Sequence, residues 1–115
     1  YPVVARTATS DGLTTGTIAD AGLIQHITVT SASANNIIVL PTPTPGTIVE
    51  LAIGSNGCEL RTDTPASVAI NGGSGSDAES ALAADSLVHI VCTSATTWQG
   101  WEVTAATLTA IEAAA

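Results

Sequence analysis

Residues 37–53 read Ile-Ile-Val-Leu-Pro-Thr-Pro-Thr-Pro-Gly-Thr-Ile-Val-Glu-Leu-Ala-Ile, and this stretch decides how the chain is organised. Both of its ends are rich in β-branched and aliphatic residues, which favour β-strands. Its middle cannot continue a strand ladder, because the prolines lack a backbone N–H and the glycine permits positive φ. The stretch therefore predicts a strand, a rigid connection and a second strand.

Working outward, the chain repeats this pattern of short strands and turns. Residues 23–30 alternate between apolar and polar side chains, and Gly-Ser-Asn-Gly at 54–57 predicts a hairpin turn. Residues 74–84 are expected to form a loop or a single helical turn. The apolar run at 87–92 predicts a central strand covered on both faces, and residues 94–97 turn it back into another strand. We therefore expect an all-β fold, an antiparallel β-barrel or jelly-roll-like sandwich of about seven to eight short strands.

A chain of 115 residues is expected to form one domain, which we place at residues 10–103. Residues 1–9 are predicted to be an extended N-terminal docking arm, and the alternatives are a plain first strand or a disordered terminus. The conformation of residues 104–115 is left open. Leu108 and Ile111 stand at helical spacing, whereas the threonines there favour extended chain.

The composition predicts a homo-oligomer. The chain contains no Phe and no Met, so its apolar content is mostly small side chains that bury little area each. The mean hydropathy is nevertheless +0.41, and no run approaches the length of about 18 apolar residues that a membrane helix needs. A chain this apolar is expected to bury surface against other copies. The alternative is that alanine alone raises the average.

The charge excludes two classes of partner. Ten acidic residues stand against Arg6 and Arg61, there is no Lys, and the net charge is -8. Such a chain repels polyanions, so we expect neither nucleic acid nor an anionic membrane as a partner.

The sequence contains no catalytic constellation, so we predict no enzymatic activity, cofactor or metal. His26 and His89 lack a nearby nucleophile and acid in a recognisable arrangement, and a metal site would require them to converge from separate strands with a carboxylate. Cys58 and Cys92 are interpreted as small buried hydrophobes, with one disulfide as the alternative. Residues 72–77 match the start of a calcium-binding nonapeptide, but the repeat occurs once, so a loop is expected.

Trp98 and Trp101 allow two interpretations. Aromatic faces pack on pyranose rings, so the pair could form a sugar-stacking platform. In a chain without Phe, however, the two Trp side chains are more often needed to fill the core or an interface.

Several of these segments resemble bacteriophage virion proteins, namely small capsid decoration (cement) proteins and domains of tail fibres. The resemblance covers somewhat over half of the chain. It lies in the following segments: Ile-Ile-Val-Leu-Pro from residue 37 with Pro45-Gly46 and Ile-Val-Glu-Leu from residue 48, Val-Ala-Ile-Asn-Gly-Gly from residue 68, residues 82–91, and Thr-Thr-Trp from residue 96 with Trp-Glu-Val from residue 101.

The resemblance implies a non-enzymatic β-domain that assembles as a homotrimer. Cement trimers sit on the outer capsid surface and bridge neighbouring copies of the major capsid protein, so the expected localisation is the virion. The alternative is a tail-fibre or receptor-binding module in which the Trp side chains meet a glycan. As a hypothesis, the N-terminal arm supplies the capsid contacts, through Tyr1, Pro2, Val3, Val4 and Arg6.

Overall fold

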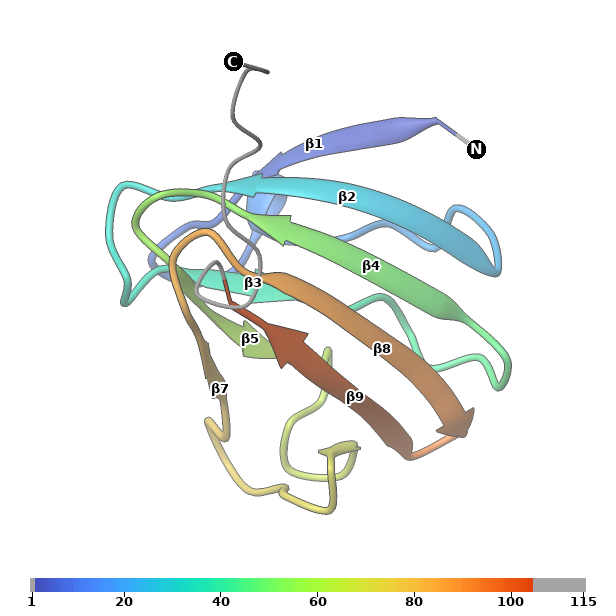
Figure 1. Cartoon of the computed structure of the whole chain (residues 1–115). Coiled ribbons are helices and arrows are strands. Elements are labelled where there is room, and N and C mark those ends of the chain that lie inside the picture. The colour runs from blue at the N-terminus through green and yellow to red at the C-terminus, as the bar shows by residue number, and fades with distance from the viewer. Residues whose placement is uncertain (1, 105–115) are drawn as a thin grey trace.

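The computed structural model describes residues 2–104 and consists of two β-sheets packed face to face (Figure 1). The predictions for Tyr1 and residues 105–115 lie outside the described residues. The strands within this range are β1 (Val3–Thr7), β2 (Ile24–Thr30), β3 (Ile37–Val39), β4 (Ile48–Ile53), β5 (Cys58–Arg61), β6 (Ala69–Ile70), β7 (Ser80–Leu82), β8 (Leu87–Ser94) and β9 (Thr97–Val103), and a 3₁₀ turn, η1, spans Thr14–Gly16.

The predicted all-β sandwich is confirmed, but its strands are not all antiparallel. One sheet has the order β1-β2-β4-β8-β9-β6 and the other has the order β3-β5-β7. Four pairs are parallel, namely β1 with β2, β2 with β4, β3 with β5, and β6 with β9. For β2 and β4, the reason is the path of the chain. It crosses to the other sheet to form β3, returns, and enters β4 in the same direction as β2.

Residues 37–53 form the predicted strand, connection and strand. Gly46, at φ +94°, donates its N–H to the Cys92 carbonyl at 2.8 Å, which anchors the end of the proline segment beside β8. The hairpin predicted at residues 54–57 is wrong. A turn does occur there, closed by the Gly57 N–H on the Gly54 carbonyl at 3.3 Å, but it joins β4 to β5 in the opposite sheet.

Three other predictions have mixed outcomes. β8 is central in its sheet, as predicted, but within residues 2–104 it is covered on one face only. Residues 80–82, expected as loop or helical turn, form strand β7 and pair with β5. The stretch at 1–9, expected as an arm or a plain first strand, contains the edge strand β1 beside β2.

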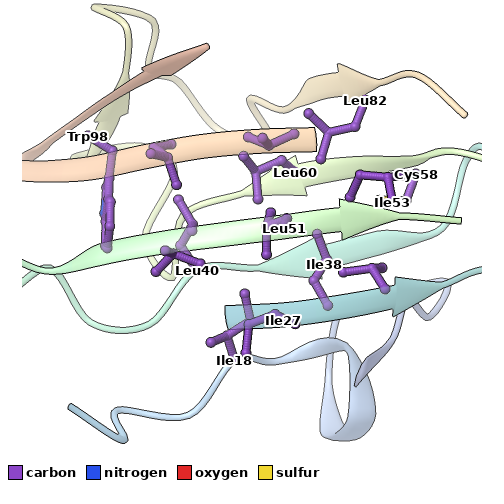
Figure 2. Close-up of a cluster of buried hydrophobic side chains, with 14 of the residues drawn as sticks. Ile18, Ile27, Ile38, Leu40, Leu51, Ile53, Cys58, Leu60, Leu82 and Trp98 are labelled. Carbon is purple, nitrogen blue, oxygen red and sulfur yellow. The ribbon is translucent and has the colours of Figure 1, made fainter. Parts of the chain in front are cut away.

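The core lies between the two sheets (Figure 2). Alternate residues of each strand point inward, so the burial pattern of β2, β4 and β8 has a period of two. The six-stranded sheet supplies Leu51, Ile90 and Trp98, and the three-stranded sheet supplies Ile38 and Leu60 against them. Trp98 is fully buried, and it supplies the large aromatic side chain of a core in a chain that contains no Phe.

Gly100 sets the approach of β9 to β8, and replacing it is expected to destabilise the fold. A Cβ at this position would lie 2.3 Å from the His89 carbonyl oxygen and 2.9 Å from the Ile90 Cα, both of which are backbone atoms. Gly100→Ala should lower the free energy of unfolding by about 1–3 kcal/mol, measured by urea denaturation. The control is Gly73→Ala, whose Cβ would have its nearest contact at 3.4 Å. Equal denaturation midpoints for the two variants would contradict the prediction.

Candidate functional site

The outer face of the six-stranded sheet, the face turned away from the core, is the most distinctive surface of the described residues. Its side chains follow from the strand registers, because residues paired across a ladder point to the same side of the sheet. Three rows result, running across the strands: Ile24, Ile48, Val91 and Gln99; Val3, His26, Glu50, His89 and Trp101; and Ala5, Thr28, Ala52, Leu87 and Val103.

This outer face is largely apolar, and no part of residues 2–104 covers it. Five of the eight exposed large hydrophobic side chains of the described residues belong to it, among them Trp101 at 61% and Leu87 at 50% exposure. The inward residues of the same strands are buried by the three-stranded sheet. Both faces carry many apolar side chains, so the main difference between them is the cover that the inner face has. Apolar patches of this kind mark surfaces that contact other molecules.

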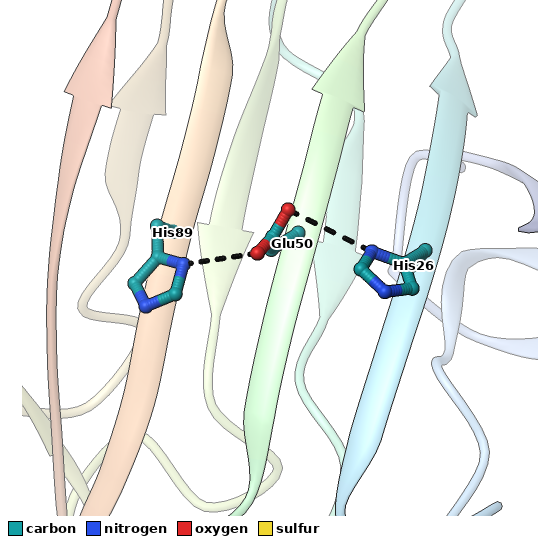
Figure 3. Close-up of polar contacts among 3 residues, drawn as sticks. All are labelled: His26, Glu50 and His89. Atoms are coloured by element: carbon teal, nitrogen blue, oxygen red, sulfur yellow. Dashed lines mark hydrogen bonds and ion pairs between the residues drawn. The ribbon is translucent and has the colours of Figure 1, made fainter. Parts of the chain in front are cut away.

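Glu50 lies between two histidines in the middle row (Figure 3). Its carboxylate oxygens are 3.3 Å from Nδ1 of His89 and 3.6 Å from Nδ1 of His26. The structure therefore brings the two histidines together with a carboxylate, as a metal site would require. However, no group of three metal-ligating side chains in residues 2–104 is arranged to hold a metal ion. His26, Glu50 and His89 are each half-buried, and together they form a line of polar side chains across a largely apolar face.

Trp101 extends the row beyond His89. The two rings stack, with centroids 4.7 Å apart and planes 26° from parallel. Trp98, three residues earlier, points into the core, because an odd spacing along a strand places side chains on opposite faces. Trp98 is thus excluded from a sugar platform, whereas Trp101 lies at the surface.

The predicted capsid-contact residues lie at one edge of the six-stranded sheet. Val3 and Val4 are exposed on opposite sides of β1, and Pro2 is exposed just before the strand. Arg6 is half-buried and shares the side of Val4, and its Nε is buried without a hydrogen-bond partner. Tyr1 lies outside the described residues. Capsid contact by this edge stays a prediction.

The interpretation of the cysteines as buried hydrophobes is confirmed. Cys58 and Cys92 are free, they lie in opposite sheets, and both are buried. Burial raises the pKa of Cys58 to about 11, and the charges of Glu59 and Glu102 act in the same direction. Burial likewise raises the pKa of Cys92. The Cys92 Sγ donates to the Ser94 carbonyl at 3.0 Å.

Residues 72–77 form the predicted loop. Asp77, at its end, lies 3.6 Å from the Arg61 guanidinium, and Arg61 also donates from Nε to Glu79 at 2.8 Å. The acids that follow the glycines therefore pair with a cation of β5, which gives them a structural role.

No protein-family model, no curated protein and no solved structure matches this chain. Among the described residues, no helix has the length and apolar character to cross a membrane.

Alkaline pH is expected to destabilise the fold through its thiols. A raised pKa means that the folded state keeps a proton that the unfolded state releases, starting near the ordinary thiol value of 9.0. The thiol contribution to stability is therefore complete below about pH 9 and is lost as the pH rises towards about 11. Urea denaturation at pH 8, 9 and 10.5 should report this loss, and Cys58→Ala should reduce its slope. The same slope in Cys58→Ala would contradict the prediction.

Proposed function

We propose that this chain is a structural virion protein, a capsid decoration (cement) protein that assembles as a homotrimer on the outer surface of a phage head. The observation that carries the proposal is the apolar outer face of the six-stranded sheet, which residues 2–104 leave exposed. The β8 sequence is typical of a strand covered on both faces, whereas residues 2–104 cover only one of them. Association with other protein would supply the second cover.

The proposed mechanism is mass action. A trimer that binds the assembled, expanded shell and not its free subunits shifts the equilibrium away from disassembly, by an amount set by its concentration relative to its dissociation constant. The net charge of -8 suits this role, because it keeps a densely packed protein dispersed and repels nucleic acid. The proposal requires no active site, so the chemistry lies in contact surfaces.

The alternative function is a tail-fibre or receptor-binding module that binds a glycan. The observation in its favour is Trp101, whose ring is 61% exposed and is held in position by stacking on His89. Carboxylate and imidazole groups beside an aromatic ring are typical of sugar-binding surfaces. Acrylamide quenching and sugar titration of Trp101 fluorescence discriminate between the functions, since the trimer of the main proposal shields this ring.

The first test is binding to shells. The protein is mixed with expanded and unexpanded shells of the major capsid protein encoded by the same genome, and bound protein is measured after pelleting. We expect saturable binding to expanded shells, and a higher temperature of shell disruption in its presence. Light scattering across a dilution series should give a mass three times 11.4 kDa. Absence of binding to both kinds of shell would contradict the proposal.

The second test concerns the N-terminal edge. Deleting residues 1–6 should abolish shell binding and leave the trimer mass unchanged, because it removes the predicted contact residues at the outer edge of the sheet and spares the face of β2, β4, β8 and β9. Arg6→Ala, in the full-length chain, should weaken shell binding at least about tenfold, since truncating one partner of a buried, hydrogen-bonded charge pair at an interface costs about 2–5 kcal/mol. The control is Arg61→Ala, which removes the other cation. Unchanged binding by the deletion variant would disprove the docking role.

A further inference from the structure

The outer face of the six-stranded sheet has its own charge distribution. Glu50 is the single carboxylate in its three rows, and a histidine flanks it on each side. Glu102, on the neighbouring strand β9, points to the other side, where its carboxylate accepts the Ala83 N–H at 2.9 Å. The face therefore carries little negative charge for a surface of an acidic chain.

This distribution favours a second copy of the chain as the occupant of the face. Two copies at a net charge of -8 repel each other unless they meet through surfaces poor in carboxylates. On the outer face, a carboxylate that arrives from another copy meets a row in which imidazoles outnumber carboxylates two to one. One part of the face is thus complementary to another part of the same face on a second copy, as the head-to-tail contacts of a cyclic trimer require.

The dimensions of the face are also adequate. The five strands that supply its rows span about 20 Å across, and the rows with their neighbours extend about 20 Å along the strands. The projected area is then on the order of 400 Å² per copy, and side-chain relief makes the accessible area larger, so a pair of faces approaches the roughly 1,000 Å² that a specific interface needs.

We propose that the outer face of the six-stranded sheet is the interface between copies of this chain, with the His26–Glu50–His89 row as its polar centre. The inference rests on the proposed homo-oligomeric function and assigns this face to the copies, which leaves the β1 edge for the capsid. Leu87 and Trp101 are the apolar anchors, because large exposed side chains that become desolvated contribute most at interfaces. In a trimer, the three faces turn towards the threefold axis, with β4 and β8 nearest to it.

The experiment compares variants that add one negative charge to the outer face with a variant that adds the same charge elsewhere on the surface. Leu87→Asp adds a carboxylate beside the middle row. Leu13→Asp is the matched control, since Leu13 is equally a solvent-exposed leucine, at 61%, and belongs to none of the three rows. Thr28→Asp is a second face variant, whose side chain is already polar and exposed, so that its monomer keeps the fold. Circular dichroism and urea denaturation verify folding of all three.

Light scattering across a dilution series then reports association. We expect the wild type and Leu13→Asp to share one oligomeric mass, and Leu87→Asp and Thr28→Asp to fall towards 11.4 kDa with dissociation constants at least about 100-fold higher. Acrylamide should quench Trp101 in the two face variants more strongly than in the wild type. Trp98, which is buried in the monomer, contributes a constant background in every variant.

Three outcomes would overturn the inference. One is a wild type that is monomeric at every concentration. Another is a pair of folded face variants that keep the wild-type mass, which would place the copy interface elsewhere. The third is a monomer whose Trp101 becomes accessible only when residues 105–115 are removed, which would assign the face to that segment. Shell pelleting tests the function separately: an oligomer that fails to bind shells contradicts the decoration role and leaves the interface standing.

Discussion

The alternation of the chain between two sheets is the constraint on which the rest of the structure depends. Each of the strands β3 to β8 lies in the opposite sheet from the strand before it, so most neighbours within a sheet are strands that are not consecutive in the sequence. Parallel pairing of β2 with β4 follows, and so does the position of β8 beside β4. The result is one wide sheet and one narrow sheet, and the narrow sheet covers the inner face of the wide one.

The sequence could predict the strands but not their pairing. The apolar runs and proline breaks at residues 37–53 determine strand and connection locally, through backbone restrictions that need no partner. A Gly-Ser-Asn-Gly turn, by contrast, can close a hairpin or carry the chain to another sheet, and only tertiary packing decides between them. β7 was missed because Ser-Ala-Leu has little strand propensity, and pairing with β5 and burial of Leu82 hold it in place.

The candidate site was predictable to a similar extent. The period of two along a strand is enough to separate His26 from its apolar neighbour Ile27 and to put Trp101 and Val103 on one face. Glu50 was not singled out, since its place between two histidines depends on the registers of three strands. A slip of one residue in β4 would turn Glu50 into the core and Val49 to the surface, and nothing local in the sequence measures that register.

The polar row has a physical reason within the proposed interface. A face made only of aliphatic side chains would associate with any apolar surface in many registers, because hydrophobic burial is not directional. A carboxylate and two imidazoles lose hydration when they are covered, and they regain hydrogen bonds only where a partner presents complementary groups. The row therefore lowers the stability of misaligned pairings more than that of the aligned one, as buried polar residues do in coiled coils. An apolar sheet face can then remain specific for one arrangement of the copies.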